Sequence, residues 1–158
     1  MNWEVIIKWL PKLAQGATLT LELVAIAVIA GLLLAIPLGI ARSSRLWWVR
    51  AFPYGYIFFF RGTPLLVQLF LVYYGLAQFD AIRSSSMWPY LRDPFWCATA
   101  TMTLHTAAYI AEILRGAIQA IPPGEIEAAR ALGMSKTKAL IYIILPRAAR
   151  IGLPAYSN

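Results

Sequence analysis

Charged residues are scarce in this chain of 158 residues, and their scarcity excludes an ordinary water-soluble domain. Asp, Glu, Lys and Arg make up 13% of the residues, about half the share found in typical soluble domains. By contrast, 60% of the residues are hydrophobic and the mean hydropathy is +0.64. Because this polar content is too small to coat a globule that faces water, we expect the chain to lie in a lipid bilayer.

Several reactive groups are missing as well. Cys97 is the single cysteine, so the chain can form no internal disulfide, and its apolar neighbours predict a buried, inert thiol. His105 is the single histidine, which excludes a metal site built from a His/Cys cluster. Without an HExxH motif or a nucleophile–base constellation, we do not expect an enzyme. A phosphate-binding loop is also lacking, because Ser135-Lys136-Thr137 is not preceded by the glycines of GxxxxGK[ST].

Acidic residues are scarcer than basic residues in this chain. The chain has 14 Lys and Arg against 7 Asp and Glu, which gives a net charge of +7. A nucleic-acid-binding protein would gather its basic residues on one soluble face. Here they lie between apolar runs, so membrane topology accounts for them better and we expect no nucleic acid partner.

Three apolar segments are long enough to cross a bilayer as helices, which takes roughly 20 residues each. They are residues 19–41, 63–79 and 95–114. Thr63 followed by Pro64 predicts the start of the second helix, with Thr63 as its N-cap. Threonines in the third segment are typical of a helix that packs against other helices. The sequence therefore predicts an all-α, polytopic membrane protein.

Lys and Arg outside these segments predict the orientation, because cytoplasmic loops carry the excess of basic residues. Ten lie between the first two segments or after the third, against four elsewhere. We therefore expect the amino terminus outside and the region after residue 114 in the cytoplasm.

Residues 1–16 lack the pattern of a cleavable signal and carry apolar residues at helical spacing. This spacing predicts an amphipathic helix on the outer membrane surface, and an unstructured tail is the alternative. The apolar stripe consists of Trp3, Ile6, Ile7, Leu10 and Leu13.

Residues 122–146 are unlike the rest of the chain, since they are rich in alanine and charge. Pro122, Pro123 and Gly124 interrupt the preceding helix, because proline cannot continue one. A new helix then begins with acidic residues in its first turn, where the helix dipole favours carboxylates. A solvated loop with ordinary capping is the alternative.

The same region predicts a second helix after a sharp turn. Gly133 supplies the left-handed residue that ends the first helix, and Ser135 caps a second helix that ends at Pro146. We therefore expect a cytoplasmic helix–turn–helix. Its first helix is thin enough for the groove of another protein to close on it, because Ala128 and Ala129 are small.

The order of residues in this region resembles the EAA signature of bacterial ABC importer permeases. The signature positions are Glu127-Ala128-Ala129, Gly133 and Ile143-x-Leu145-Pro146. Further motifs resemble the polar amino acid uptake family, most closely its membrane subunits for histidine, lysine, arginine, ornithine and opines. These motifs are Arg61-Gly62-Thr63-Pro64-Leu65 at the start of the second span, Ala108-Tyr109-x-x-Glu112, Arg115-Gly116-Ala117-Ile118 and the closing Leu153-Pro154-Ala155-Tyr156-Ser157-Asn158.

The resemblance, which covers nearly the whole chain, implies a type I ABC importer permease fold in the bacterial inner membrane. It implies a permease subunit of an ATP-driven importer for polar, chiefly basic, amino acids or opines. Partners implied are an ABC ATPase dimer, a second permease subunit and an external amino acid-binding protein, with ATP bound by the ATPase. The implied ATPase-coupling residues are Gly124, Glu125, Glu127, Ala128, Ala129, Arg130 and Gly133.

Members of this family continue with further spanning segments, whereas this chain stops at Asn158. The resemblance therefore predicts an incomplete fold in which residues 147–158 begin a missing span. A truncated, non-transporting remnant or an assembly-only subunit is the alternative function.

Glu112 is the sharpest candidate for substrate contact, because an acid within a span is costly and functional by default. Tyr109 and His105 share roughly one helical face with it, and Thr106 is a weaker candidate. A carboxylate here can meet the ammonium or cationic side chain of an amino acid, whereas pairing with Arg115 is the alternative. For His105 we favour a hydrogen-bonded packing role over metal or proton chemistry.

Arg61 lies at the predicted cytoplasmic edge of the second span, in the motif with Gly62, Thr63 and Pro64. An arginine at such an edge is typically an anchor to lipid headgroups, which is the interpretation we favour. A gate or a contact with the ATPase is the alternative.

Overall fold

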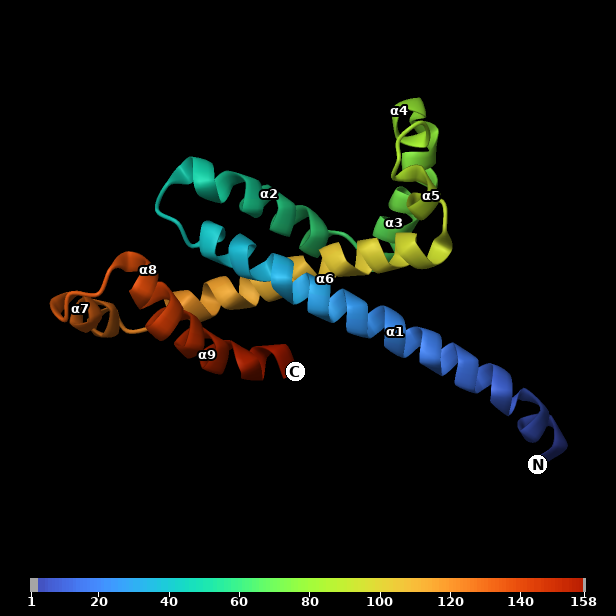
Figure 1. Cartoon of the computed structure of the whole chain (residues 1–158), viewed down its shortest axis with the longest axis horizontal. Helices are drawn as coiled ribbons and strands as arrows, with labels where there is room; N and C mark the ends of the chain where they lie inside the picture. The colour runs from blue at the N-terminus through green and yellow to red at the C-terminus, as the bar shows by residue number, and fades with distance from the viewer. Residues whose placement is uncertain (1–2, 158) are drawn as a thin grey trace.

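The computed structural model describes the backbone of residues 3–157 and the side chains of residues 7–156. Within that part of the chain the elements are helices joined by short turns, without a strand (Figure 1). The predicted all-α fold class is confirmed. Trp3 and Ile6 of the predicted amphipathic stripe lie outside the described side chains.

The first helix, α1, runs without a break over Trp3–Arg42. It contains residues 3–16 of the predicted surface helix together with the predicted span, 19–41, so within the described residues the two are one continuous helix. Thr18 and Thr20 lie at the junction, and their hydroxyls donate to the carbonyls of Ala14 and Gly16 within the same helix.

Residues that we expected to form a loop make a second long helix, α2, Trp47–Gly62. Thr63 then ends α2 rather than capping the next helix, because its hydroxyl donates to the Phe59 carbonyl. The next helix starts one residue beyond Pro64, and it bends away from α2 by 108°. It comprises α3, Leu65–Phe70, a π-helical turn, Leu71–Gly75, and a 3-10 turn, Leu76–Gln78.

Two short helices, α4 (Asp80–Arg83) and α5 (Trp88–Leu91), project from the far end of α3 (Figure 1). The long helix α6, Pro94–Gln119, then returns through the centre of the molecule. Asp93 caps it by accepting hydrogen bonds from the first amides of the helix. α6 extends beyond residue 114, where we expected the third span to end.

The carboxy-terminal part consists of α7 (Pro123–Ala131), α8 (Lys136–Ala139), a π-helical turn (Leu140–Ile144) and α9 (Leu145–Ser157). Pro146 does not end the helix as predicted. Proline lacks an N–H and crowds the carbonyl four residues earlier, but the π-helical turn widens the spiral just before it. There the Leu145 amide bonds to the Leu140 carbonyl, five residues back.

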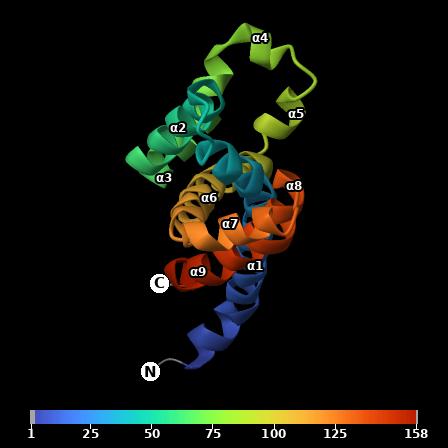
Figure 2. The ribbon, with the colours of Figure 1, turned by 90° about the vertical axis from the view of Figure 1, so that its left-hand side faces the viewer.

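α6 is the central helix of the bundle. α7 and α8 lie at one of its ends and α3 at the other, while α2 and α9 lie on opposite sides (Figures 1 and 2). Its partner α1 presents buried small residues at every fourth position, namely Ala27, Gly31, Ala35 and Gly39. Such spacing lets two helix backbones approach closely.

By length and composition, the described residues contain one helix able to cross a membrane by itself, within α1. The bent pair Trp47–Gly62 and Leu65–Gln78 passes the same test as one broken span. α6 has 26 residues, about 39 Å of helix, but it is less apolar. Its role as a third span remains a prediction.

Candidate functional site

The candidate coupling helix, α7, begins as the sequence predicts. Pro122 holds its N-cap position in an extended conformation, with Pro123 as its first helical residue. Glu125 follows in the first turn, where the positive end of the helix dipole stabilises its carboxylate.

The end of α7 is a Schellman motif around Gly133. Gly133 has a φ of +77°, the only positive φ among the described residues, so its predicted left-handed conformation is confirmed. Its amide donates to the Arg130 carbonyl at 2.9 Å, and the Met134 amide donates to the Ala129 carbonyl at 3.1 Å. Ser135 then caps α8 by accepting from an amide of its first turn, which is also as predicted.

α7 buries one alanine and exposes most of its outer face. Ala129 is 1% exposed, because α8 and the π-helical turn fold back against α7. It therefore cannot enter a partner's groove, which corrects the expectation that Ala128 and Ala129 serve together. Leu132, which the sequence reasoning missed, is 83% exposed just beyond the helix. The other exposed side chains are those of Glu127, Ala128, Arg130 and Ala131.

An apolar cluster and one ion pair join α7 to the bundle. Ile126 packs against the buried Ile121 and Ala148. Glu125 Oε1 lies 3.2 Å from Arg147 Nη2 on α9. These contacts connect α7 directly to α9 and to the end of α6.

Gln68 holds the bend between α2 and α3, and it is 2% exposed. Its Nε2 lies 2.8 Å from the Phe60 carbonyl, 2.9 Å from the Thr63 carbonyl and 2.7 Å from the Thr63 hydroxyl. Its Oε1 lies 3.1 Å from His105 Nδ1 on α6. Because an amide oxygen only accepts, His105 Nδ1 carries the hydrogen in this pair. The Gln68 side chain thus supplies hydrogen bonds to the backbone carbonyls at the bend and connects the bend to α6.

A cavity of about 330 Å³, here called the charged cavity, lies between α1, α2 and α6. Arg42 of α1 enters it from one side, with its guanidinium carbon 4.8 Å from the centre of the Tyr54 ring. Arg61 of α2 and Tyr109 and Glu112 of α6 line the rest of its polar wall. The cavity therefore brings two arginines and two tyrosines to one carboxylate.

Glu112 is paired in this structure. Its Oε1 accepts a 2.7 Å hydrogen bond from Arg115 Nη2 and lies 3.8 Å from Arg61 Nη1. Its Oε2 is buried without a hydrogen-bond partner, as is the Nε atom of Arg115. The pairing with Arg115 expected as the alternative is thus present, and one carboxylate oxygen remains able to accept a bond. Substrate contact by Glu112 stays a prediction.

Arg61 contacts α6 although its side chain is 44% exposed, and its interpretation as a lipid anchor stays a prediction. Its guanidinium carbon lies 5.4 Å from the centre of the Tyr109 ring, beside Glu112. Because residues 47–62 form a helix, Arg61 lies about 21 Å along α2 from Trp47.

The other two candidates on α6 do not line the charged cavity. His105 stacks on Tyr109, with ring centres 4.8 Å apart, and bonds to Gln68. Thr106 faces α1, where its Cγ2 would lie 3.0 Å from a Cβ atom at Gly31. Thr106 therefore belongs to the packing of the two long helices, which corrects its assignment to the substrate path.

Two features escaped the sequence reasoning. The four-residue spacing of small residues in α1 was the available signal for its packing against α6. Gln68 lies in an otherwise apolar run, and a lone amide in such a run is a signal for an internal hydrogen-bonded position.

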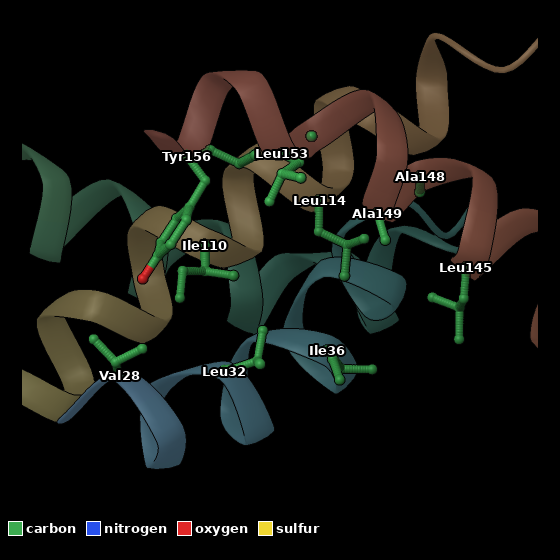
Figure 3. Close-up of a pocket in the computed structure, with 12 residues that line it drawn as sticks. Val28, Leu32, Ile36, Ile110, Leu114, Leu145, Ala148, Ala149, Leu153 and Tyr156 are labelled. Carbon is green, nitrogen blue, oxygen red and sulfur yellow. The ribbon is translucent and has the colours of Figure 1, made fainter. Parts of the chain in front are cut away.

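A larger cavity, of about 490 Å³, lies between α1, α6 and α9 (Figure 3). Its wall is almost entirely apolar, with Leu32 and Ile36 from α1, Ile110 and Leu114 from α6, and Leu153 from α9. No charged side chain lines it, and the Tyr156 hydroxyl is the one side-chain polar group among its lining residues.

Comparison with known proteins places the chain in one family. Residues 11–156 match the family described as binding-protein-dependent transport system inner membrane component. The chain is 51% identical over 146 residues to the octopine transport system permease protein OccM of Rhizobium radiobacter. It is 43% identical over 159 residues to the nopaline transport system permease protein NocM of Agrobacterium fabrum. It is 42% identical over 144 residues to the histidine/lysine/arginine/ornithine permease protein HisM of Salmonella typhimurium.

These alignments span most of this chain but not all of its relatives. They cover 92%, 100% and 90% of the chain and 60%, 66% and 61% of the three relatives, in that order. Among solved structures, a crystal structure of an amino acid ABC transporter with histidines has a TM-score of 0.79 at 35% identity. That match covers 98% of this chain and 68% of the other. The chain belongs to the inner membrane components of binding-protein-dependent transport systems, with the fold of an ABC importer permease.

Proposed function

We propose that this chain is the permease subunit of an ATP-driven importer for polar amino acids or opines, with a preference for basic substrates. The observation that carries the proposal is the family match over residues 11–156. The names of the relatives support the substrate class, since they refer to octopine, nopaline and basic amino acids. The expected partners are an ATPase dimer, a second permease subunit and an external binding protein.

The proposed orientation in the inner membrane has the amino terminus outside and α7 in the cytoplasm. Arg42, Arg45 and Arg50 then lie on the cytoplasmic side, as the excess of basic residues in cytoplasmic loops requires. α2 and α3 together return the chain outward as one broken span, and α6 crosses back. Broken helices at membrane depth are tolerated where they are buried in protein, and Gln68 supplies the bonds at this break.

The ATPase is proposed to bind the outer face of α7. That face combines the exposed Glu127 with exposed alanines and the projecting Leu132. The Glu125–Arg147 ion pair and the contacts of Ile126 then pass the motion to α9 and α6. Such a lever needs a packed connection, because packed elements move as bodies rather than deform.

Substrate is proposed to pass the charged cavity. The free Oε2 of Glu112 can accept a hydrogen bond from an ammonium or guanidinium group. Arg42 and Arg61 face the same space and suit a carboxylate, which amino acids and opines carry. Tyr109 and Glu112 remain the proposed substrate contacts, while His105 supports Tyr109 from one turn away.

Uptake tests the function. Cells that carry the chain together with its ATPase, partner permease and binding protein are given labelled octopine, arginine or glutamate. We expect uptake of octopine or arginine that depends on ATP, little uptake of glutamate, and a marked loss with Glu112→Gln. The absence of uptake with all partners present and assembled would reject transport and favour an assembly-only subunit.

Co-purification tests the coupling helix separately. Glu127→Arg should abolish recovery of the ATPase with the chain, because it reverses the exposed charge of α7. Asp80→Arg makes the same charge change on an exposed side chain at the opposite end of the molecule and serves as the control. Equal recovery of the ATPase with both variants would reject α7 as its binding site.

A further inference from the structure

A second cavity lies beside the turn that joins α1 to α2, next to the charged cavity, with which it shares Arg42 and Tyr54. Its volume is about 410 Å³, and it is lined by Arg42, Trp47, Arg50, Ala51 and Tyr54. Four of these residues fall on one face of α2, at positions one turn apart. The cavity is thus a slot between the last residue of α1 and the first two turns of α2.

The slot is strongly positive. Arg42 and Arg50 line it without an acidic residue among its walls, and neither makes an ion pair within the part of the chain that the structure describes. Arg42 is held in position over the Tyr54 ring, and its buried Nε has no hydrogen-bond partner. Arg42 also faces Glu112 across the charged cavity, but no acidic residue lines the slot, so guanidinium donors of both arginines are available to an anion there.

The first turn of α2 adds to the positive potential. It contains no acidic residue, and Leu46 at the N-cap offers no side-chain acceptor to its amides. The dipole of this 16-residue helix is therefore not compensated at its positive end. With the two arginines, this end favours an anion beside residues 47–50.

The surroundings of the slot fit a membrane surface. Trp47 is 67% exposed and Trp48 is 61% exposed, and indole rings prefer the headgroup level of a bilayer. α1, which ends at Arg42, is the helix able to cross the membrane by itself. The slot therefore lies where a spanning helix meets the interface.

We propose that this slot binds the phosphodiester of an anionic phospholipid, such as phosphatidylglycerol, through Arg42 and Arg50. Trp47 and Tyr54 flank the headgroup, and Ala51 leaves room for it. Basic pockets between helices at the cytoplasmic side are a chemical fit for anionic headgroups. The bound lipid fixes the corner between α1 and α2, and it does so whether or not the chain transports a substrate.

The test uses the full chain in nanodiscs made of equal parts phosphatidylglycerol and phosphatidylcholine. Native mass spectrometry then counts the lipids that stay bound. Phosphatidylglycerol should be retained over phosphatidylcholine, and Arg50→Gln should weaken its retention by about five-fold, the contribution of one arginine near an anionic surface. Arg50 lines this slot but not the charged cavity.

Two matched variants separate a discrete site from diffuse attraction. Arg45→Gln makes the same charge change in the turn just before α2 but outside the slot, so it should lower retention clearly less than Arg50→Gln does. Ala51→Leu changes no charge but fills the slot, so it should displace the lipid as strongly as Arg50→Gln does. Equal effects of Arg45→Gln and Arg50→Gln, or unchanged retention with Ala51→Leu, would overturn the proposal.

Inorganic phosphate distinguishes the two sources of the anion. If millimolar phosphate displaces phosphatidylglycerol completely, the slot is a site for free anions and the lipid assignment is wrong. Retention of phosphatidylglycerol in the presence of phosphate supports it. Circular dichroism of each variant checks that the helices are intact, so that a loss of lipid reports on the slot.

Discussion

Two of the neighbours of α6, namely α1 and α2, pack against it in different ways. Against α1 the two backbones nearly touch, because Gly31 and Gly39 leave no space for even a Cβ atom. Against α2, Ile57 packs on Ala108 and Ala111 and the Tyr56 hydroxyl donates to the Leu104 carbonyl, but the charged cavity of about 330 Å³ opens beside these contacts. One side of the same helix is thus closely packed and the other is partly hollow.

The difference shows how one chain can combine a fixed frame with a space that changes. Close packing of small residues resists small displacements, because every shift produces an overlap. Long side chains around a cavity can change rotamer at little cost, so the α2 side can open or close while α1 and α6 stay together. The predictions below test this contrast, from the largest expected effect to the smallest.

Gly39→Leu should have the largest effect on stability. A Cβ atom at this position would lie 2.9 Å from Leu114 Cδ2 and 3.0 Å from the Ala111 carbonyl oxygen, so the helices must separate. We expect a loss of about 3 kcal/mol in the free energy of unfolding, measured by denaturation in mixed detergent micelles.

Gly16→Leu is the matched control, since no heavy atom lies within 4 Å of a Cβ atom there. The control should leave the free energy of unfolding unchanged or slightly raise it, because leucine favours a helix over glycine. Comparable losses for the two variants would mean that α1 and α6 are not closely packed.

Gln68→Leu should have the next largest effect, on the hollow side. The substitution keeps the volume but removes the donor for two backbone carbonyls at the bend, which then stay buried and unpaired. We expect a loss of about 2 kcal/mol. Gln78→Leu, which removes only a 3.4 Å bond to the Tyr74 carbonyl, should cost far less. If both cost the same, Gln68 does not hold the bend.

The Glu112–Arg115 pair should contribute a smaller amount. A double-mutant cycle with Glu112→Gln and Arg115→Gln should give a coupling energy of about 1 kcal/mol, because the two side chains are only partly shielded from solvent. A coupling energy near zero would show that the two groups do not depend on each other, and that Glu112 is held by Arg61 instead.

Leu33→Ala should have the smallest effect. Leu33 is 66% exposed on the outer face of α1, so it can exchange contacts with lipid or detergent for other such contacts. We expect a change below about 0.5 kcal/mol in the same denaturation experiment. A loss as large as that of Gly39→Leu would place Leu33 in an interface and reverse the assignment of the two faces.

The sequence predicted those features that depend on a single residue and its neighbours. Gly133 could be read as a helix terminator because glycine adopts positive φ without strain, and Ser135 could be read as a cap. The apolar length of α1 sufficed to predict a spanning helix. Local chemistry decides these features, so distant parts of the chain do not alter them.

Other features depend on contacts that are distant in the sequence. The sequence predicted Thr63 as the N-cap of the next helix. In the structure its hydroxyl donates to the Phe59 carbonyl of α2 and accepts a hydrogen bond from Gln68 Nε2. The approach of Arg61 to Glu112 could not be predicted, because it depends on residues 47–62 forming a helix. Ala129 belongs to the family signature, yet it is buried by the fold of α8. In each case the local sequence allows two positions for the side chain, and a contact with a residue or helix distant in the sequence selects one of them.

The π-helical turn before Pro146 also sets the angular position of everything that follows. One residue more than an α-helical turn requires rotates the remainder of the helix by about 100°. Deletion of a single residue from Leu140–Ile144 would restore regular geometry and yet swing Arg147 away from Glu125. The irregular turn thus sets the rotation of α9 about its axis, and this rotation places Arg147 beside Glu125 of α7.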